Sequence, residues 1–310
     1  MPSSPDHRSG GGPRSVYVTN QLDNTLSVID AGHAKAVATV PVGTSPTGVA
    51  VTPDGQHAYI AEAGDDTVSV LDTGTRTIAA TVALPGGSSP RGVALGPDGR
   101  FLYIAGGGSN RVSVLDTRSN ALVASVPVGT QPVSVAVTSD GASAYVANSG
   151  SDNVSVIDTR TNRVVRVLPA GKFPVGVAIT PDGASAYVAN QLSATITVLD
   201  TKGGAARATI PAGTGPFDVA MNADGRSAYV ADLGPGQLIV VDTRTRKVAS
   251  TVDIGPFGTD PFNVTVSSHA IYVTNQGANT LAVINPGTLR VVTTVPTGSS
   301  PYGVAVHDPA

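Results

Sequence analysis

The sequence of 310 residues contains no cysteine and no tryptophan, and only 13% of its residues are charged. Without cysteine, the chain can form no disulfide and perform no thiol chemistry. The formal net charge is −3, and no run of Lys or Arg offers the positive surface that nucleic acids require. No apolar run reaches the roughly 18 residues of a membrane-spanning helix. We therefore expect neither a nucleic acid nor a membrane as a partner.

The first 15 residues also lack the apolar segment of a signal peptide, because Met1–Ser15 is polar and rich in Gly, Ser and Pro. We interpret residues 1–15 as a disordered tail and residues 16–310 as a single domain. A cytoplasmic location follows from this interpretation. A secreted protein from which a leader had been removed would look the same.

What the sequence does contain is a repeat marked by a tyrosine. The seven copies begin at Tyr17, Tyr59, Tyr103, Tyr145, Tyr187, Tyr229 and Tyr272, and the steps between them are 42, 44, 42, 42, 42 and 43 residues. Each complete unit holds four short β-rich runs, as in Thr47–Thr52, His57–Ala61, Thr67–Asp72 and Thr77–Ala83. Repeats of this length predict an all-β fold, a seven-bladed β-propeller of four-stranded antiparallel blades.

The ends of the repeat array predict how the ring closes. The first unit begins at Val16–Asn20, which corresponds to the second strand of a blade, and the last unit ends on an unmatched inner strand at Tyr302–Val306. We predict that this C-terminal strand completes the N-terminal blade and removes the exposed edges of an open array. A closed ring of this kind is expected to be monomeric.

Aspartates recur at two turns of each unit. Asp-Gly between the first and second strands supplies the positive φ of a tight hairpin, and Asp after the third strand can bond to its own turn. We interpret eleven aspartates as structural on this basis: Asp30, Asp54, Asp72, Asp98, Asp116, Asp140, Asp158, Asp182, Asp200, Asp224 and Asp242.

Copies of Y-[VI]-[AT]-x, preceded by a PDG-type turn and followed by a [ST]-V-x-D strand, resemble the YVTN family of β-propeller repeats. The resemblance covers about Val16 to Val306. It implies the propeller fold but no single activity, because the family includes cell-surface proteins, cytochrome-like and lactonase-like relatives, and proteins without a known role. Many members are secreted.

Deviations between repeats indicate where function lies. The loop entering each inner strand (the D–A loop) and the loop between the second and third strands (the B–C loop) should open on one face, around the channel mouth. The D–A loops of blades five, six, seven and one, which are consecutive, contain Phe173, Phe217, Phe257, Phe262 and Tyr302. Such an aromatic arc is typical of a small-molecule pocket. The alternative is that these rings only plug the mouth.

Polar deviations are expected at the same face. Glu62 is the only glutamate, Asp232 replaces an Asn of the repeat, and Asp218 occupies a position where four units have Gly. We interpret these three residues as candidate acid/base groups and Arg91, the one arginine in a D–A loop, as an anchor for an anionic group. The alternative is that Glu62 and Asp232 are solvated loop charges. Candidate polar ligand contacts are Asn20, Asn148, Asn190, Asn263, Asn275 and Lys172.

No cofactor is expected, since none of the five histidines joins this set, although carboxylate and amide oxygens could hold Mg²⁺ or Ca²⁺. The hypothesis that follows is a small-molecule-binding propeller. It would be a cofactor-independent acid/base enzyme of the lyase, cyclase, isomerase or hydrolase type, acting on an apolar or aromatic molecule at the channel mouth. The alternative is a non-catalytic scaffold that binds a protein or peptide.

Overall fold

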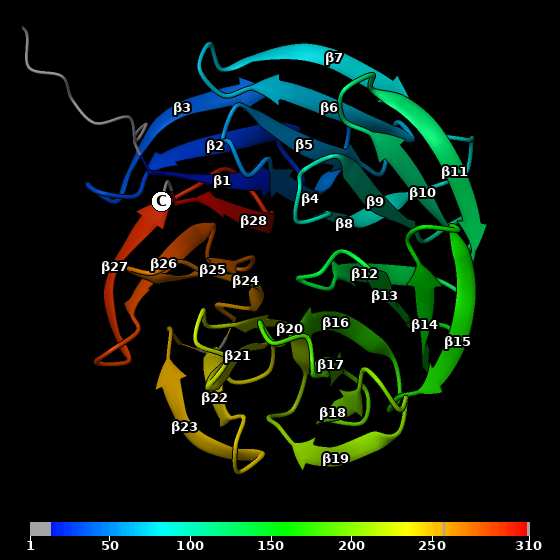
Figure 1. The fold of residues 1–310 in the computed structure, drawn as a ribbon. Coiled ribbons are helices and arrows are strands. Elements are labelled where there is room, and N and C mark those ends of the chain that lie inside the picture. The colour runs from blue at the N-terminus through cyan, green and yellow to red at the C-terminus, as the bar shows by residue number, and fades with distance from the viewer. Residues whose placement is uncertain (1–13, 257, 309–310) are drawn as a thin grey trace, which may run out of the picture.

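The computed structural model describes residues 14–256 and 258–308, and within these ranges 28 strands form seven four-stranded antiparallel sheets. Figure 1 shows the sheets arranged as blades around a ring. The described residues contain no helix, and so none that could cross a membrane. Most of the predicted tail, and Phe257, lie outside the described residues, whereas Ser15 belongs to the first strand.

The strands fall into four concentric sets. The inner strands are β28 (Pro301–His307), β4 (Pro46–Val51), β8 (Pro90–Leu95), β12 (Pro132–Val137), β16 (Pro174–Ile179), β20 (Pro216–Met221) and β24 (Pro261–Val266). The second strands are β1 (Ser15–Asn20), β5 (His57–Glu62), β9 (Phe101–Gly106), β13 (Ser143–Asn148), β17 (Ser185–Asn190), β21 (Ser227–Asp232) and β25 (Ile271–Asn275). The third strands are β2 (Thr25–Asp30), β6 (Thr67–Asp72), β10 (Arg111–Asp116), β14 (Asn153–Asp158), β18 (Thr195–Asp200), β22 (Gln237–Asp242) and β26 (Thr280–Asn285). The outer strands are β3 (Lys35–Pro41), β7 (Thr77–Ala83), β11 (Ala121–Pro127), β15 (Arg163–Pro169), β19 (Ala206–Pro211), β23 (Lys247–Asp253) and β27 (Arg290–Pro296).

The ring closes as the sequence predicts. The first blade has the strand order β28-β1-β2-β3, so the C-terminal strand is its inner strand. In Figure 1 the red β28 lies beside the blue β1, and the register pairs Ser15 with His307 and Val18 with Val304. The predicted closure of the N-terminal blade by the C-terminal strand is confirmed.

Repeat tyrosines link several blades to the next one along the chain. Tyr59 and Tyr145 are each 1% exposed. The Tyr59 hydroxyl donates to the carbonyl of Thr117 at 3.2 Å, and the Tyr145 hydroxyl donates to the carbonyl of Thr201 at 3.2 Å. Both acceptors belong to the following blade. Burial of the phenol raises the pKa of both tyrosines, so the hydroxyls stay protonated donors.

The turns also follow the sequence prediction. Gly55 and Gly141 of the Asp-Gly turns have φ of 70° and 72°. Asp54 accepts the N–H of Gln56 at 3.0 Å, and Asp72 accepts the N–H of Thr75 at 2.8 Å, which satisfies the turn backbone. Hydrogen bonds to these turn groups lower the pKa of both carboxyls, so both remain ionised and structural at neutral pH.

Glycines at one level of the ring let the inner strands approach one another. A Cβ atom on Gly48 would lie 2.4 Å from the carbonyl oxygen of Arg91, and one on Gly303 would lie 2.4 Å from that of Thr47. Both oxygens belong to the neighbouring inner strand, so no side chain fits there without moving backbone. Three blades have Ser134, Asp218 or Asn263 at this level in place of glycine, so their side chains lie at the channel.

Candidate functional site at the channel mouth

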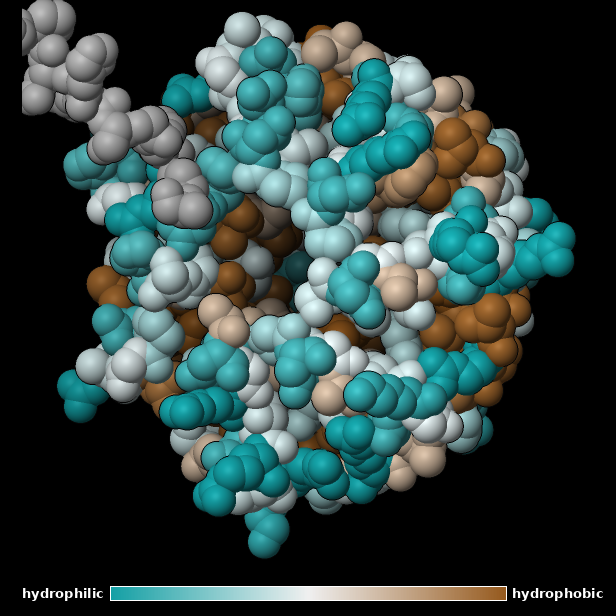
Figure 2. All heavy atoms as spheres, viewed as in Figure 1, coloured by the Kyte–Doolittle hydropathy of each residue, from teal (hydrophilic) through white to brown (hydrophobic). Residues whose placement is uncertain are grey.

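One cavity lies on the axis of the ring, and a second adjoins it beside blades three to six. Figure 2 shows one face hollowed at its centre. The deeper one, which we call the channel cavity, has a volume of about 200 Å³. Inner strands of all seven blades line it, through Gly48, Val49, Gly92, Val93, Val133, Ser134, Val135, Val175, Val177, Phe217, Asp218, Val219, Asn263, Tyr302, Gly303 and Val304.

The second cavity, the mouth cavity, has a volume of about 360 Å³ and shares Val133, Val175 and Phe217 with the channel cavity. Its other lining residues are Ser89, Arg91, Gly107, Gly108, Gln131, Pro132, Ser149 and Phe173. These residues come from D–A loops, B–C loops and the starts of inner strands, so both loop sets border the mouth as expected. Phe173 holds a left-handed backbone with φ of 55°, a conformation that a bulky residue adopts only at a cost.

Three aromatic rings from consecutive blades stack along one wall. The ring centroids of Phe217 and Phe262 are 3.8 Å apart, and those of Phe262 and Tyr302 are 4.5 Å apart. Tilted pairs at such distances stabilise each other beyond simple burial. Phe217 borders both cavities and Tyr302 lines the channel cavity, whereas Phe262 lines neither and is packed between these two rings.

Asp218 is the titratable carboxylate of the channel cavity. Its Oδ2 accepts the backbone N–H of Val264 at 3.1 Å, and its Oδ1 lies where a Cβ atom on Gly176 would be 2.9 Å away. The side chain therefore lies between the inner strands of both neighbouring blades. Desolvation by the surrounding protein raises the pKa of Asp218 to about 7, although hydrogen bonds from backbone N–H groups oppose the rise. Near neutral pH this carboxyl can both donate and accept a proton.

Tyr302 interacts electrostatically with Arg91 and with Asp218. Burial raises the pKa of the Tyr302 hydroxyl, while the charge of Arg91 and a hydrogen bond from its guanidinium oppose the rise. The negative charge of Asp218 raises the pKa of Tyr302 further. Arg91, Asp218 and Tyr302 come from blades three, six and one, so the ring brings together groups that are far apart in sequence.

Glu62 and Asp232 lie elsewhere. Glu62 is 1% exposed, and its carboxylate accepts the N–H of Gly43 at 2.7 Å and the hydroxyl of Thr67. Asp232 is 0% exposed and accepts the N–H of Gly215 at 2.6 Å. Neither lines either cavity. They are not solvated charges, as the alternative interpretation has it, but buried groups that hold D–A loops.

The asparagines at the position of Glu62 have the same surroundings. Asn20 is 0% exposed, donates to Ser27 at 2.9 Å and accepts the N–H of Gly298 at 3.0 Å. Asn148, Asn190 and Asn275 are also buried and do not line the cavities. Lys172 is exposed and pairs with Asp152 at 2.7 Å. Of the predicted polar ligand contacts, Asn263 alone lines the channel cavity.

Sequence reasoning missed most of the lining residues, among them Ser134, Gly107 and Gly108. Ser134 occupies the same level as Asp218 and Asn263, so the departure from glycine that singled out Asp218 could also have found it. Gly107 and Gly108 line the mouth cavity within the B–C loop of blade three. Among the described residues, no group of three or more His, Asp or Glu side chains is placed to hold a metal ion.

Sequence comparison places the chain in a family. Residues 12–122 and 48–207 match the family described as "Lactonase, 7-bladed beta-propeller". The chain belongs to this family. The lactonase-family match agrees with the seven blades of the structure, and no curated protein matches the sequence.

Solved structures share the fold of this lactonase-family chain at low sequence identity. Hydrazine synthase of Kuenenia stuttgartiensis has a TM-score of 0.76 and 22% identity, over 83% of this chain and 88% of that one. A functionally unknown protein from Desulfotomaculum acetoxidans DSM 771 has a TM-score of 0.81 and 17% identity, over 96% and 99%. The dihydro-heme d1 dehydrogenase NirN in complex with DHE has a TM-score of 0.70 and 18% identity, over 96% of this chain and 66% of that one.

Proposed function

We propose that the protein binds an apolar or aromatic small molecule in the mouth and channel cavities, and that Asp218 transfers a proton to or from it. The observation that carries this proposal is the position of Asp218, a carboxyl with a pKa of about 7 in a channel walled by Phe217 and Tyr302. A general acid or base acts best when its pKa lies near the working pH. The rings supply the apolar contact, and Arg91 supplies a fixed positive charge.

The reaction types that such a site supports need no cofactor. They are elimination, cyclisation, isomerisation and hydrolysis, in each of which protons are transferred as a bond to carbon forms or breaks. The family description favours the opening of a lactone by water. There the acyl C–O bond breaks as water adds to the carbonyl carbon, and the ring oxygen must gain a proton. Neutral Asp218 could give that proton, and ionised Asp218 could remove one from the attacking water.

The sequence signature supports a finer family assignment, the YVTN type of repeat. Tyr17-Val18-Thr19-Asn20 and Tyr272-Val273-Thr274-Asn275 carry that motif unchanged. In the structure Thr19 donates to the carbonyl of Thr47 at 2.6 Å, and Thr274 donates to that of Tyr302 at 2.9 Å. The motif thus couples second strands to inner strands near the channel, which is a structural contribution compatible with many ligands.

Native mass spectrometry tests binding. We expect the gently purified protein to carry a small bound mass that the double variant Phe217→Ala/Phe262→Ala loses. A protein without bound mass in both cases contradicts small-molecule binding and favours a scaffold.

Proton transfer needs a second test, applied to any substrate found in this way. Asp218→Asn should lower kcat by about 10²-fold or more, since general acid–base catalysis contributes that much. Glu62→Gln is the matched control, because Glu62 is buried outside both cavities. If Glu62→Gln abolishes turnover and Asp218→Asn does not, the assignment to Asp218 is wrong.

A further inference from the structure

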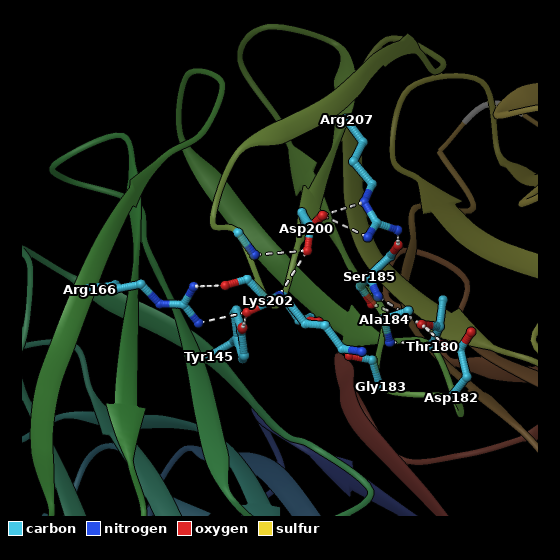
Figure 3. Close-up of polar contacts among 12 residues, drawn as sticks. Tyr145, Arg166, Thr180, Asp182, Gly183, Ala184, Ser185, Asp200, Lys202 and Arg207 are labelled. Carbon is cyan, nitrogen blue, oxygen red and sulfur yellow. Dashed lines mark hydrogen bonds and ion pairs between the residues drawn. The ribbon is translucent and has the colours of Figure 1, made fainter.

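The arginines of this propeller differ in what they contact. Arg207 pairs with Asp200 at 2.7 Å, and Arg166 donates to the carbonyls of Lys202 and Thr201 at 2.9 and 2.6 Å. Figure 3 shows Arg207 turned towards Asp200 and Arg166 towards Lys202. These two guanidiniums are occupied by the protein itself and tie strands together. Arg91 has no such partners: within residues 14–256 and 258–308, no carboxylate lies within ion-pair distance of it.

Arg91 nevertheless lines a cavity. It borders the mouth cavity and interacts with the Tyr302 hydroxyl of the channel cavity. A guanidinium has five N–H donors in a planar fork. One phenol oxygen can accept only part of this set, so most donors remain available to a guest. A planar anion with two oxygens matches the fork best.

The neighbouring B–C loop makes room for such a guest. A Cβ atom on Gly107 would lie 3.3 Å from Nε of Arg91 and 3.3 Å from the carbonyl oxygen of Pro132. A Cβ atom on Gly108 would lie 2.3 Å from the carbonyl oxygen of Gly87. Both glycines line the mouth cavity. A side chain on Gly107 would narrow the space beside the guanidinium, and one on Gly108 would displace the backbone at Gly87. Blade three thus combines the one D–A loop arginine with a B–C loop that has two consecutive glycines at the cavity wall.

The charges also have an order along the axis. Arg91 is at the mouth cavity, Phe217 borders both cavities, and Asp218 lies in the channel cavity. A ligand that spans both would place its anion at the mouth, its apolar body against Phe217 and its reacting end near Asp218. The reverse orientation would put an anion beside a carboxylate, which is unfavourable.

We infer that the ligand class of this site is an aromatic or apolar monocarboxylate, whose carboxylate binds in the fork of Arg91 beside Gly107. This rests on the proposed small-molecule function and adds the charge and orientation of the ligand. Recognition of the carboxylate is independent of any chemistry at Asp218, so it can be measured without turnover.

The test uses two probes of the same shape, 3-phenylpropanoate and the uncharged 3-phenylpropanamide, titrated calorimetrically at pH 7.5. We expect the carboxylate to bind about 10- to 100-fold more tightly than the amide, the range for a hydrogen bond to a charged group. Arg91→Gln should remove this preference while leaving amide binding unchanged. Gly107→Val should weaken carboxylate binding as well.

Arg111→Gln is the matched control. Arg111 carries the same charge on β10 but donates to Ser125 at 2.7 and 2.8 Å and lines neither cavity. If Arg111→Gln loses the preference for the carboxylate as much as Arg91→Gln does, the overall electrostatic potential of the protein selects the anion. That result would overturn the inference.

Other outcomes separate the inference from the proposed function. If both probes bind equally to the unaltered protein and Phe217→Ala weakens both, the pocket exists but the carboxylate assignment is wrong. If neither probe binds, the inference is overturned, and the bound mass in native mass spectrometry decides the proposed function separately.

Discussion

The carboxylate of Asp218 accepts the backbone N–H of Val264 at 3.1 Å, across the gap between the inner strands of blades six and seven. At the corresponding level, Gly48 and Gly303 let their neighbours come into direct backbone contact. Asp218 therefore replaces a close approach of two strands with a hydrogen bond made by a titratable group. Its protonation should affect both the stability of the ring and the chemistry of the channel.

The first prediction concerns stability against pH. The pKa of Asp218 is raised from 3.8 to about 7 in the folded protein, so its contribution is fully present below pH 3.8 and is lost as the pH rises towards 7. Asp218→Asn should remove this loss, so the variant should gain unfolding free energy relative to the unaltered protein at pH 8 more than at pH 5. One pKa unit corresponds to about 1.4 kcal/mol, and about two units lie between pH 5 and the folded pKa of about 7. The upper bound for this pair of pH values is therefore about 3 kcal/mol, reduced where the channel admits water.

Urea unfolding of Asp218→Asn at both pH values checks this. Asp253→Asn serves as the control, because Asp253 is an exposed carboxyl at the end of β23. The same pH response in both variants would show that the shift does not arise at Asp218.

The second prediction concerns the glycine level of the ring. Gly48→Ala would place a Cβ atom 2.4 Å from the carbonyl oxygen of Arg91, which is backbone and cannot turn aside. We expect a loss of about 1–3 kcal/mol of unfolding free energy, as for overpacked cores. Gly86→Ala is the control, because nothing lies within 4 Å of its added Cβ atom. Equal denaturation midpoints for the two variants would contradict tight contact between the inner strands.

The third prediction concerns the caps of the D–A loops. Asn24 and Asn110 have left-handed backbones and accept the N–H groups of Ser45 and Gln131, each at 2.8 Å. The equivalent Ala194 has φ of 52° but no side-chain acceptor. Asn tolerates this conformation better than Ala, so Ala194→Asn should raise the unfolding free energy by about 0.5–1 kcal/mol.

The reciprocal change Asn110→Ala should lower the unfolding free energy by about 1–2 kcal/mol, because it loses the cap and introduces the unfavourable backbone. Thermal unfolding of both variants measures the pair. If the unfolding free energy changes in the same direction in Ala194→Asn and Asn110→Ala, capping is not the common cause.

The fourth prediction concerns closure. Deletion of residues 300–310 removes β28 and exposes the edge of β1 together with one side of the channel. We expect the truncated chain to lose cooperative unfolding, since the inner strand of a whole blade is missing. Differential scanning calorimetry is the measurement. A single sharp transition at the temperature of the full chain would show that the ring does not need its C-terminal strand.

Most of the fold could be predicted from the sequence because its signals are local and repeated. Tyrosines at steps of 42–44 residues and Asp-Gly turns fix strand number and turn positions without knowledge of distant contacts. The candidate site could be predicted only in part. Phe217, Phe262 and Tyr302 were found because aromatic residues are rare in this chain, and Asp218 because it interrupts a set of glycines.

The position of Glu62 shows why rarity alone misleads. It is the only glutamate, yet its strand ends with the side chain turned towards the D–A loop, where the N–H of Gly43 needs an acceptor. Which way a side chain at a strand end points depends on the loop packed against it, and no pattern of spacing records that. Asp232 has the same explanation. Its carboxylate accepts the N–H of Gly215, because Ala194, at the position of the capping asparagines Asn24 and Asn110, has no side-chain acceptor for that N–H group.

The pairing of Ser15 with His307 has a mechanical consequence. These two residues lie opposite each other at one end of the antiparallel ladder between β1 and β28. A force that pulls the two chain ends apart would therefore load the interstrand bonds one after another, as a zipper opens, and never all at once. The strand pairing that closes the ring should therefore have low mechanical stability even if it contributes to thermal stability. Blade one should be the first blade to unfold under tension.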